Sequence, residues 1–163
     1  MSDNGGPTPN NASLNAPLRG GKGILLEGGI RVPFSMTWPA KLKAGSSYNH
    51  AVSSLDLAAS FTELAGGKFK KEEMDGVNLI PFITGERAGQ PHESLKWRFT
   101  ISAAMVSGDW KLVRLPDRMP LLYNLKNDLA EQRNLAYEER ERTELMLKQL
   151  GDWDVKLPHP IFL

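Results

Sequence analysis

Apolar and polar residues alternate through the second half of the chain in a pattern that predicts a small antiparallel sheet. Residues 97–101 alternate between large apolar and polar side chains, which is typical of a half-buried strand. The apolar runs 104–106 and 110–115 flank Ser107-Gly108-Asp109, a sequence that favours a hairpin turn. Residues 121–125 predict a further strand.

A helix is predicted over 138–150, and Leu147, Leu150 and Trp153 would point inward from it. A sheet and a helix each have an apolar face that must be buried. We therefore expect residues 96–163 to form a small antiparallel sheet packed on a C-terminal helix.

A second helix is predicted over 54–65. Leu57, Phe61 and Leu64 recur at helical spacing along one side, and Gly66-Gly67 supplies a stop. The pattern indicates a core-facing helix.

Residues 30–38 read as a strand whose alternate apolar positions are Val32, Phe34, Met36 and Trp38. The short apolar run 79–83 predicts a helical turn or an extended linker. A polar segment follows, and we place a domain boundary near residue 95, which divides the chain into 1–95 and 96–163.

Residues 2–23 are rich in Gly, Pro and Asn and predict a long irregular stretch. Loops of this length are uncommon in compact domains and are usually functional or disordered. "SDNGG" at residues 2–6 combines hard oxygen donors with two glycines, which suits a tight loop around an ion.

Composition narrows the possible functions. The chain has 163 residues with a formal net charge of +1, which gives no electrostatic reason to expect nucleic acid or an anionic membrane as partner. The chain has no cysteine, so disulfides, thiolate metal sites and thiol nucleophiles are excluded. No apolar run is long enough for a membrane span and no signal peptide is visible, and the compartment stays open.

Several strings together resemble the C-terminal third of the type I sulfatases (arylsulfatases), in the order and spacing of that family. The strings are "SDNGG" (2–6), "PLRGGKG" (17–23), "EGGIRVPF" (27–34), "SLDLAASFTELAG" (54–66), "DG" (75–76), "GDWKLV" (108–113) and "LYNLKNDLAEQRNLA" (122–136).

This resemblance implies that residues 1–95 are the C-terminal part of an α/β domain of the alkaline phosphatase superfamily. It implies hydrolysis of sulfate esters with a bound calcium ion and a formylglycine nucleophile. It also implies that Asp3 and Asn4 are metal ligands and that Lys22 contacts the sulfate group of the substrate.

Other polar and aromatic residues are interpreted as structural. We expect Glu27 and Arg31 to form an ion pair beside Gly28-Gly29. The four tryptophans are expected in the core or at subdomain contacts. We expect all three histidines to be exposed and assign none a catalytic role; they are His50, His92 and His159.

The nucleophile pattern of the family, Cys or Ser followed by x-Pro-x-Arg, is absent from this chain. Pro116-Asp117-Arg118 matches its second half, but Arg114 stands where the pattern requires Cys or Ser. We therefore expect a sulfatase fragment that is inactive alone and binds calcium weakly. It would act with a missing N-terminal half or associate with itself, through the exposed apolar side of the 54–65 helix and the edge of the 30–38 strand.

Two alternatives stay open. The first is a non-catalytic remnant that binds anionic saccharides through Lys22, Arg19 and the small sheet. The second is part of a phosphonate or phosphate ester hydrolase of the same superfamily.

Overall fold

Four strands from the second half of the chain form one sheet in the order β1-β2-β3-β4. The strands are β1 (Leu95–Phe99), β2 (Ser102–Ser107), β3 (Trp110–Arg114) and β4 (Leu121–Asn124). β3 pairs antiparallel with both β2 and β4, and the turn between β2 and β3 lies at the predicted Gly108. The predicted hairpin and sheet are confirmed.

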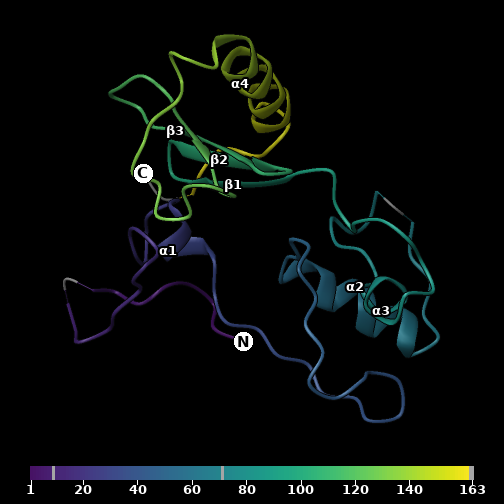
Figure 1. Cartoon of the computed structure of the whole chain (residues 1–163). Helices are drawn as coiled ribbons and strands as arrows, with labels where there is room; N and C mark the ends of the chain where they lie inside the picture. The colour runs from purple at the N-terminus through teal and green to yellow at the C-terminus, as the bar shows by residue number, and fades with distance from the viewer. Residues whose placement is uncertain (9, 71, 162–163) are drawn as a thin grey trace. The chain divides into compact units, whose positions relative to one another are not determined.

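Helix α4 (Arg140–Asp154) covers one face of this sheet (Figure 1). Leu112 pairs with Met105 and Leu122 across the strands, and these side chains form a core with Leu150, which is fully buried. Leu147 and Trp153 pack against the same core, as predicted. The helix extends a few residues beyond its predicted end.

The other face of the sheet is also buried. Ala104, Val113 and Tyr123 form a second cluster there with Leu25, and Trp97 packs against it. The short helix α1 (Glu27–Ile30) contributes Ile30 and lies on the opposite side of the sheet from α4 (Figure 1). Side chains alternate between the faces of a strand, so Lys111 of β3 belongs to this second face, where its side chain is fully buried.

The computed structural model describes residues 1–8, 10–70 and 72–161. Contacts divide the chain into two compact units, Met36–Leu95 and a unit that combines Met1–Ser35 with Lys96–Leu163. The domain division at residue 95 stays a prediction. Within the described ranges, no helix is both long enough and apolar enough to cross a membrane.

The unit Met36–Leu95 contains helices α2 (Leu55–Leu64) and α3 (Ile80–Thr84). Both were predicted, α3 as one of two possibilities. The buried side of α2 carries Asp56, Ala59 and Ser60, whereas Phe61 and Leu64 are 59% and 42% exposed. The predicted core-facing side is therefore wrong for Phe61 and Leu64, because Ala59 and Ser60 face the interior of this unit instead. The exposure of the apolar side agrees with our other expectation for this helix.

Asp56 is the polar centre of this unit. Its carboxylate accepts hydrogen bonds from the backbone N–H groups of Ser53 and Val77 at 2.7 and 2.9 Å. Nε2 of His92 lies 2.9 Å from both carboxylate oxygens. The expectation that all three histidines are exposed is thus wrong for His92, whose side chain is only 11% exposed, and right for His50 and His159.

The predicted strand at 30–38 is wrong. α1 ends at Ile30, and residues 31–38 have no regular secondary structure. Pro33 lacks an N–H group and Pro39 follows closely, so this segment is a poor member of a hydrogen-bonded ladder. Every strand of the described sheet comes from residues 95–124, which leaves the segment without a pairing partner.

Candidate functional site

Three glycine-rich segments that are separate in sequence lie against one another in the first unit. Gly5 N–H donates to the carbonyl of Gly29 at 2.9 Å, and Gly28 N–H donates to the carbonyl of Arg19 at 2.8 Å. Lys22 N–H donates to the carbonyl of Gly6 at 3.4 Å. We call this arrangement the glycine junction; its members are Gly5, Gly6, Gly20, Gly21, Gly28 and Gly29.

Only glycine fits at the tightest contacts of the junction. A Cβ atom placed on Gly5 would lie 1.7 Å from the carbonyl oxygen of Gly28, and one on Gly29 would lie 1.8 Å from that of Ile24. Both contacts are with backbone atoms, which cannot move away as the end of a flexible side chain would. The backbones therefore pack directly against each other.

The Asn15 side chain holds two of the three segments together. Its Oδ1 accepts the N–H of Gly6 at 3.0 Å. Its Nδ2 donates to the carbonyls of Gly6 and Gly20 at 2.9 and 3.0 Å. The Asn15 amide thus bonds to both segments. The irregular stretch that opens the chain therefore has a defined set of hydrogen bonds.

The residues that the resemblance implicates lie at the exposed rim of the junction. Asp3 and Lys22 are exposed, and Asn4 is half-buried. The bond from Lys22 N–H to Gly6 brings the backbone of the predicted sulfate-contacting residue next to the segment that carries the predicted metal ligands. Within the described part of the chain, the Asp3 carboxylate and the Lys22 ammonium form no ion pair.

These residues fit a calcium ion in kind but not in number. Asp3 and Asn4 offer carboxylate and amide oxygens, the donors that calcium prefers, whereas the ion takes about six to eight oxygens. Among the described residues, no group of three or more His, Cys, Asp or Glu side chains is arranged to hold a metal. The chain offers part of a donor set.

A buried ion network beneath the junction was not predicted. Lys111 Nζ lies 2.9 Å from Oε1 of Glu27 and 2.8 Å from Oε1 of Glu131. The side chains of Lys111 and Glu131 are fully buried, and that of Glu27 is 6% exposed. Lys111 is thus the cation shared by two carboxylates on the α1 side of the sheet.

Glu131 joins this network to the junction. Its Oε2 accepts the backbone N–H of Glu27 at 2.7 Å, and its backbone carbonyl accepts Nη1 of Arg19 at 2.9 Å. Burial raises the pKa of the Glu131 carboxyl, whereas Lys111 and the Glu27 N–H lower it. Burial outweighs these two contacts, so the net effect is a raised pKa of the Glu131 carboxyl.

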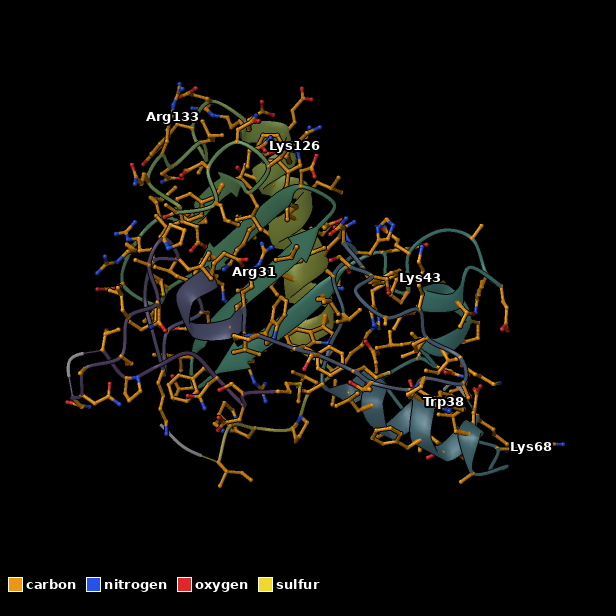
Figure 2. The ribbon with its side chains drawn as sticks, turned by 60° about the horizontal axis from the view of Figure 1, so that its bottom comes forward. Arg31, Trp38, Lys43, Lys68, Lys126 and Arg133 are labelled. Atoms are coloured by element: carbon orange, nitrogen blue, oxygen red, sulfur yellow. The ribbon has the colours of Figure 1, made fainter. Side chains whose placement is uncertain are left out.

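The predicted pair between Arg31 and Glu27 is present, with 3.6 Å between Nη1 and Oε2, which is longer than the 2.9 Å between Lys111 and Glu27. Arg31 is labelled in Figure 2. Arg31 is 57% exposed, so its contribution is screened by solvent. Arg31 is thus a second cation beside the Glu27 carboxylate, in addition to Lys111. The main partner of Glu27 is the buried Lys111.

The predicted structural role of the tryptophans is confirmed for three of them. Trp110 and Trp153 pack on the core beneath α4, and Trp97 packs on the cluster of the opposite face. Trp110 also contacts the Arg142 guanidinium, which lies 4.3 Å from the ring centroid. Trp38 is half-buried in the other unit.

Comparison with known protein families identifies the class of the chain. The family described as "N-sulphoglucosamine sulphohydrolase, C-terminal" matches residues 21–153. The match covers most of the 163 residues, so the chain belongs to this sulfatase family and corresponds to its C-terminal portion. It includes Lys22 and begins after Asp3 and Asn4.

Individual relatives agree with this assignment. A protein named "Sulfatase" from Formosa agariphila is 32% identical over 180 residues, which cover 95% of this chain and 32% of the relative. Human "Arylsulfatase H" is 37% identical over 102 residues, covering 58% of this chain and 18% of the relative. The chain therefore spans about a third or less of the length of these curated relatives.

Solved structures show the same fold. The crystal structure of Ps i-CgsB matches 99% of this chain and 37% of its own, with a TM-score of 0.87 and 30% identity. A phosphonate monoester hydrolase of Agrobacterium radiobacter matches 69% of this chain and 27% of its own with a TM-score of 0.55, at 19% identity, which shows likeness of fold alone. The predicted fold class and sulfatase membership are confirmed.

Replacing Lys111 tests the buried network. We expect Lys111→Met to lower the free energy of unfolding by about 3–5 kcal/mol, because two buried carboxylates lose their shared cation. Urea unfolding followed by circular dichroism measures this change. The matched control is Lys126→Met, at an exposed lysine after β4 (Figure 2), where we expect a change within about 0.5 kcal/mol. Equal effects of the two substitutions would contradict the assigned role of Lys111.

Proposed function

We propose that this chain serves as the C-terminal part of a sulfatase active site. In this proposal, Lys22 contacts the sulfate group of a sulfate ester, and Asp3 and Asn4 supply oxygen ligands to a calcium ion. When bound, the ion would neutralise negative charge on the sulfate. The observation that carries the proposal is the backbone contact of the segment bearing Lys22 with the segment bearing Asp3 and Asn4.

The chemistry of the junction supports this role. A sulfate ester carries a negative charge that an ammonium group stabilises, most effectively when it is held in place before reaction. Lys22 lies between Gly21 and Gly23, which have no side chains to obstruct a ligand, and its ammonium forms no ion pair with a described residue. The position combines a free cation with an unobstructed approach.

We propose a sulfated oligosaccharide as the substrate class, with support from two solved structures. Ps i-CgsB, 30% identical over nearly the whole of this chain, has been solved in complex with k-i-k-neocarrahexaose. A second structure, 26% identical with a TM-score of 0.72, belongs to work on the metabolism of multiple glycosaminoglycans. Both concern saccharides, so we assign this chain a saccharide sulfate ester in preference to a small aryl sulfate.

The proposed site requires residues from elsewhere in a sulfatase fold. The chain contains no cysteine and no Cys/Ser-x-Pro-x-Arg pattern, and covalent catalysis needs its nucleophile. Asp3 and Asn4 leave most of the calcium shell to other donors. We therefore propose that this chain alone has no appreciable sulfatase activity.

A chimera tests the role of Lys22. This chain replaces the matching third of the Formosa agariphila sulfatase, and sulfate release is measured on an aryl sulfate and on sulfated oligosaccharides. We expect the chimera to be active and Lys22→Met to lower kcat/KM roughly 100-fold, since it removes one electrostatic contact in the transition state. Lys126→Met is the exposed control and should retain the activity of the chimera.

The outcomes separate the candidate functions. A folded chimera without sulfatase activity would contradict the sulfatase proposal, and faster release from an aryl phosphate would favour the phosphate or phosphonate ester alternative. Calorimetric binding of sulfated saccharides by the chain alone, with an inactive chimera, would favour the binding module. An active chimera that is unaffected by Lys22→Met would overturn the role of Lys22.

Calcium binding is tested at Asp3. In the chimera we expect Asp3→Ala to weaken calcium binding roughly 10- to 100-fold, because one charged oxygen ligand is lost. Calorimetric titration of the metal-free chimera measures the affinity. Asp152→Ala, at an exposed acid near the end of α4, is the control. Equal calcium affinity in the Asp3 variant and the unmodified chimera would remove Asp3 from the ligand set.

Helix α2 carries exposed apolar side chains that suit a contact with a partner. Leu55, Phe61 and Leu64 are 55%, 59% and 42% exposed, and we propose that they contact the remainder of the sulfatase fold or, in its absence, a second copy. We expect the chain alone to self-associate, and a Phe61→Ser/Leu64→Ser variant to shift toward monomer in sedimentation velocity. A chain that is monomeric at every concentration tested would contradict this prediction.

A further inference from the structure

We propose that Glu131 is a positioning residue for Lys22, acting through the start of α1 and the glycine junction. This inference rests on the proposed function, in which Lys22 contacts the sulfate group. Glu131 lies in the loop after β4, far from Lys22 in sequence, and its side chain is fully buried. It does not touch substrate in this proposal and is not a catalytic residue.

Glu131 holds three separate parts of the first unit. Its carboxylate contacts Lys111 of β3 at 2.8 Å and the backbone N–H of Glu27 at 2.7 Å. Its backbone carbonyl accepts the Arg19 guanidinium at 2.9 Å. One residue therefore fixes the sheet, the first residue of α1 and the segment that leads to Lys22.

These contacts form a closed cycle of hydrogen bonds that includes part of the glycine junction. Glu131 binds Glu27 N–H, the adjacent Gly28 N–H binds the carbonyl of Arg19, and the Arg19 side chain returns to Glu131. Lys22 lies three residues after Arg19, and its own N–H bonds to Gly6. Displacing Glu27 would therefore move the carbonyl and N–H groups that define the path of the backbone at Lys22.

The backbone conformation of Glu131 supports a role beyond core packing. Its φ is +55°, in the left-handed region that side chains other than glycine, asparagine and aspartate rarely adopt. Such a conformation persists where surrounding contacts over-determine it, and it is enriched at functional sites. At Glu131 those contacts are the ion pair with Lys111 and the hydrogen bond that the carboxylate accepts from Glu27 N–H.

The neighbouring loop is fixed on both sides of Glu131. The carboxylate of Asp128 accepts the N–H groups of Gln132 and Arg133 at 3.0 and 2.9 Å. Oδ1 of Asn134 accepts the N–H of Leu122 in β4 at 2.9 Å. Glu131 therefore extends from a loop that is tied to itself and to the sheet, which suits a residue that must hold another segment in place.

A double-mutant cycle in the chimera tests the inference. We expect Glu131→Gln to lower kcat/KM roughly 10- to 100-fold, mainly through kcat, because Lys22 loses its alignment. If Glu131 acts through Lys22, adding Glu131→Gln to Lys22→Met should cause no further loss. Glu138→Gln, at an exposed glutamate in the same region, is the control. If Glu131 were purely structural, Glu131→Gln would lower the melting temperature, and the losses of kcat/KM from Glu131→Gln and Lys22→Met would multiply in the double variant. This result would overturn the proposal.

A second variant covers the case in which Glu131→Gln fails to fold. Arg19→Met removes the side-chain bond to the Glu131 carbonyl, together with the contact of Arg19 with Tyr123, and leaves the Glu131 side chain in place. We expect a smaller loss of kcat/KM in the same direction, again absent in the Lys22→Met background. Full activity of the Arg19 variant together with an unfolded Glu131 variant would overturn the proposal.

A readout that needs no activity separates this inference from the proposed function. Amide hydrogen exchange on the 163-residue chain, followed by NMR, reports the Gly28 and Gly5 bonds directly. We expect Glu131→Gln to speed exchange at these two amides roughly 10-fold and to leave Leu112 in β3 unchanged. Unchanged Gly28 protection, or equal acceleration at all three amides, would overturn the positioning role. An inactive chimera with selective acceleration at the junction would contradict the sulfatase proposal alone.

Discussion

The ion pairs of Lys111 are the interaction on which the arrangement of the first unit depends. Removing an ammonium and two carboxylates from water costs several kcal/mol per ion, and their mutual attraction offsets this cost only when all partners are in place. Lys111 belongs to the central strands, Glu27 begins α1 and Glu131 follows β4. Their joint burial therefore makes the glycine junction and the sheet interdependent.

The sheet and its helix could be predicted because their signals are local. The hairpin follows from apolar runs around Gly108, and Leu147, Leu150 and Trp153 share the inward side of one helix. Lys111 gave no such signal, since a lysine between Trp110 and Leu112 reads as the solvent-facing position of an alternating strand. Its partner Glu27 lies 84 residues away, and the covering of the second sheet face by residues from the start of the chain was not visible in any local pattern.

The wrong expectations share one cause, which is that they depend on partners distant in the sequence. The alternation at 30–38 satisfies the periodicity of a strand, but a strand also needs a neighbour to receive its hydrogen bonds. The strands of the described residues all lie within 95–124 and pair with one another. The His92 side chain is largely buried because Asp56, far from it in sequence, offers a buried carboxylate. The candidate site residues Asp3, Asn4 and Lys22 came from resemblance and stay predictions, whereas the contact between their segments came from the structure.

The glycine junction has a consequence for how such a site can diversify. Positions where backbone meets backbone, such as Gly5 and Gly29, accept no larger residue without rebuilding the loop. Exposed positions at the rim, such as Asp3 and Lys22, can change without disturbing the packing beneath them. The glycines that pack backbone against backbone cannot change, whereas the exposed positions around them can. A new ligand preference is therefore accessible by single substitutions at the exposed positions while the glycine junction keeps its conformation.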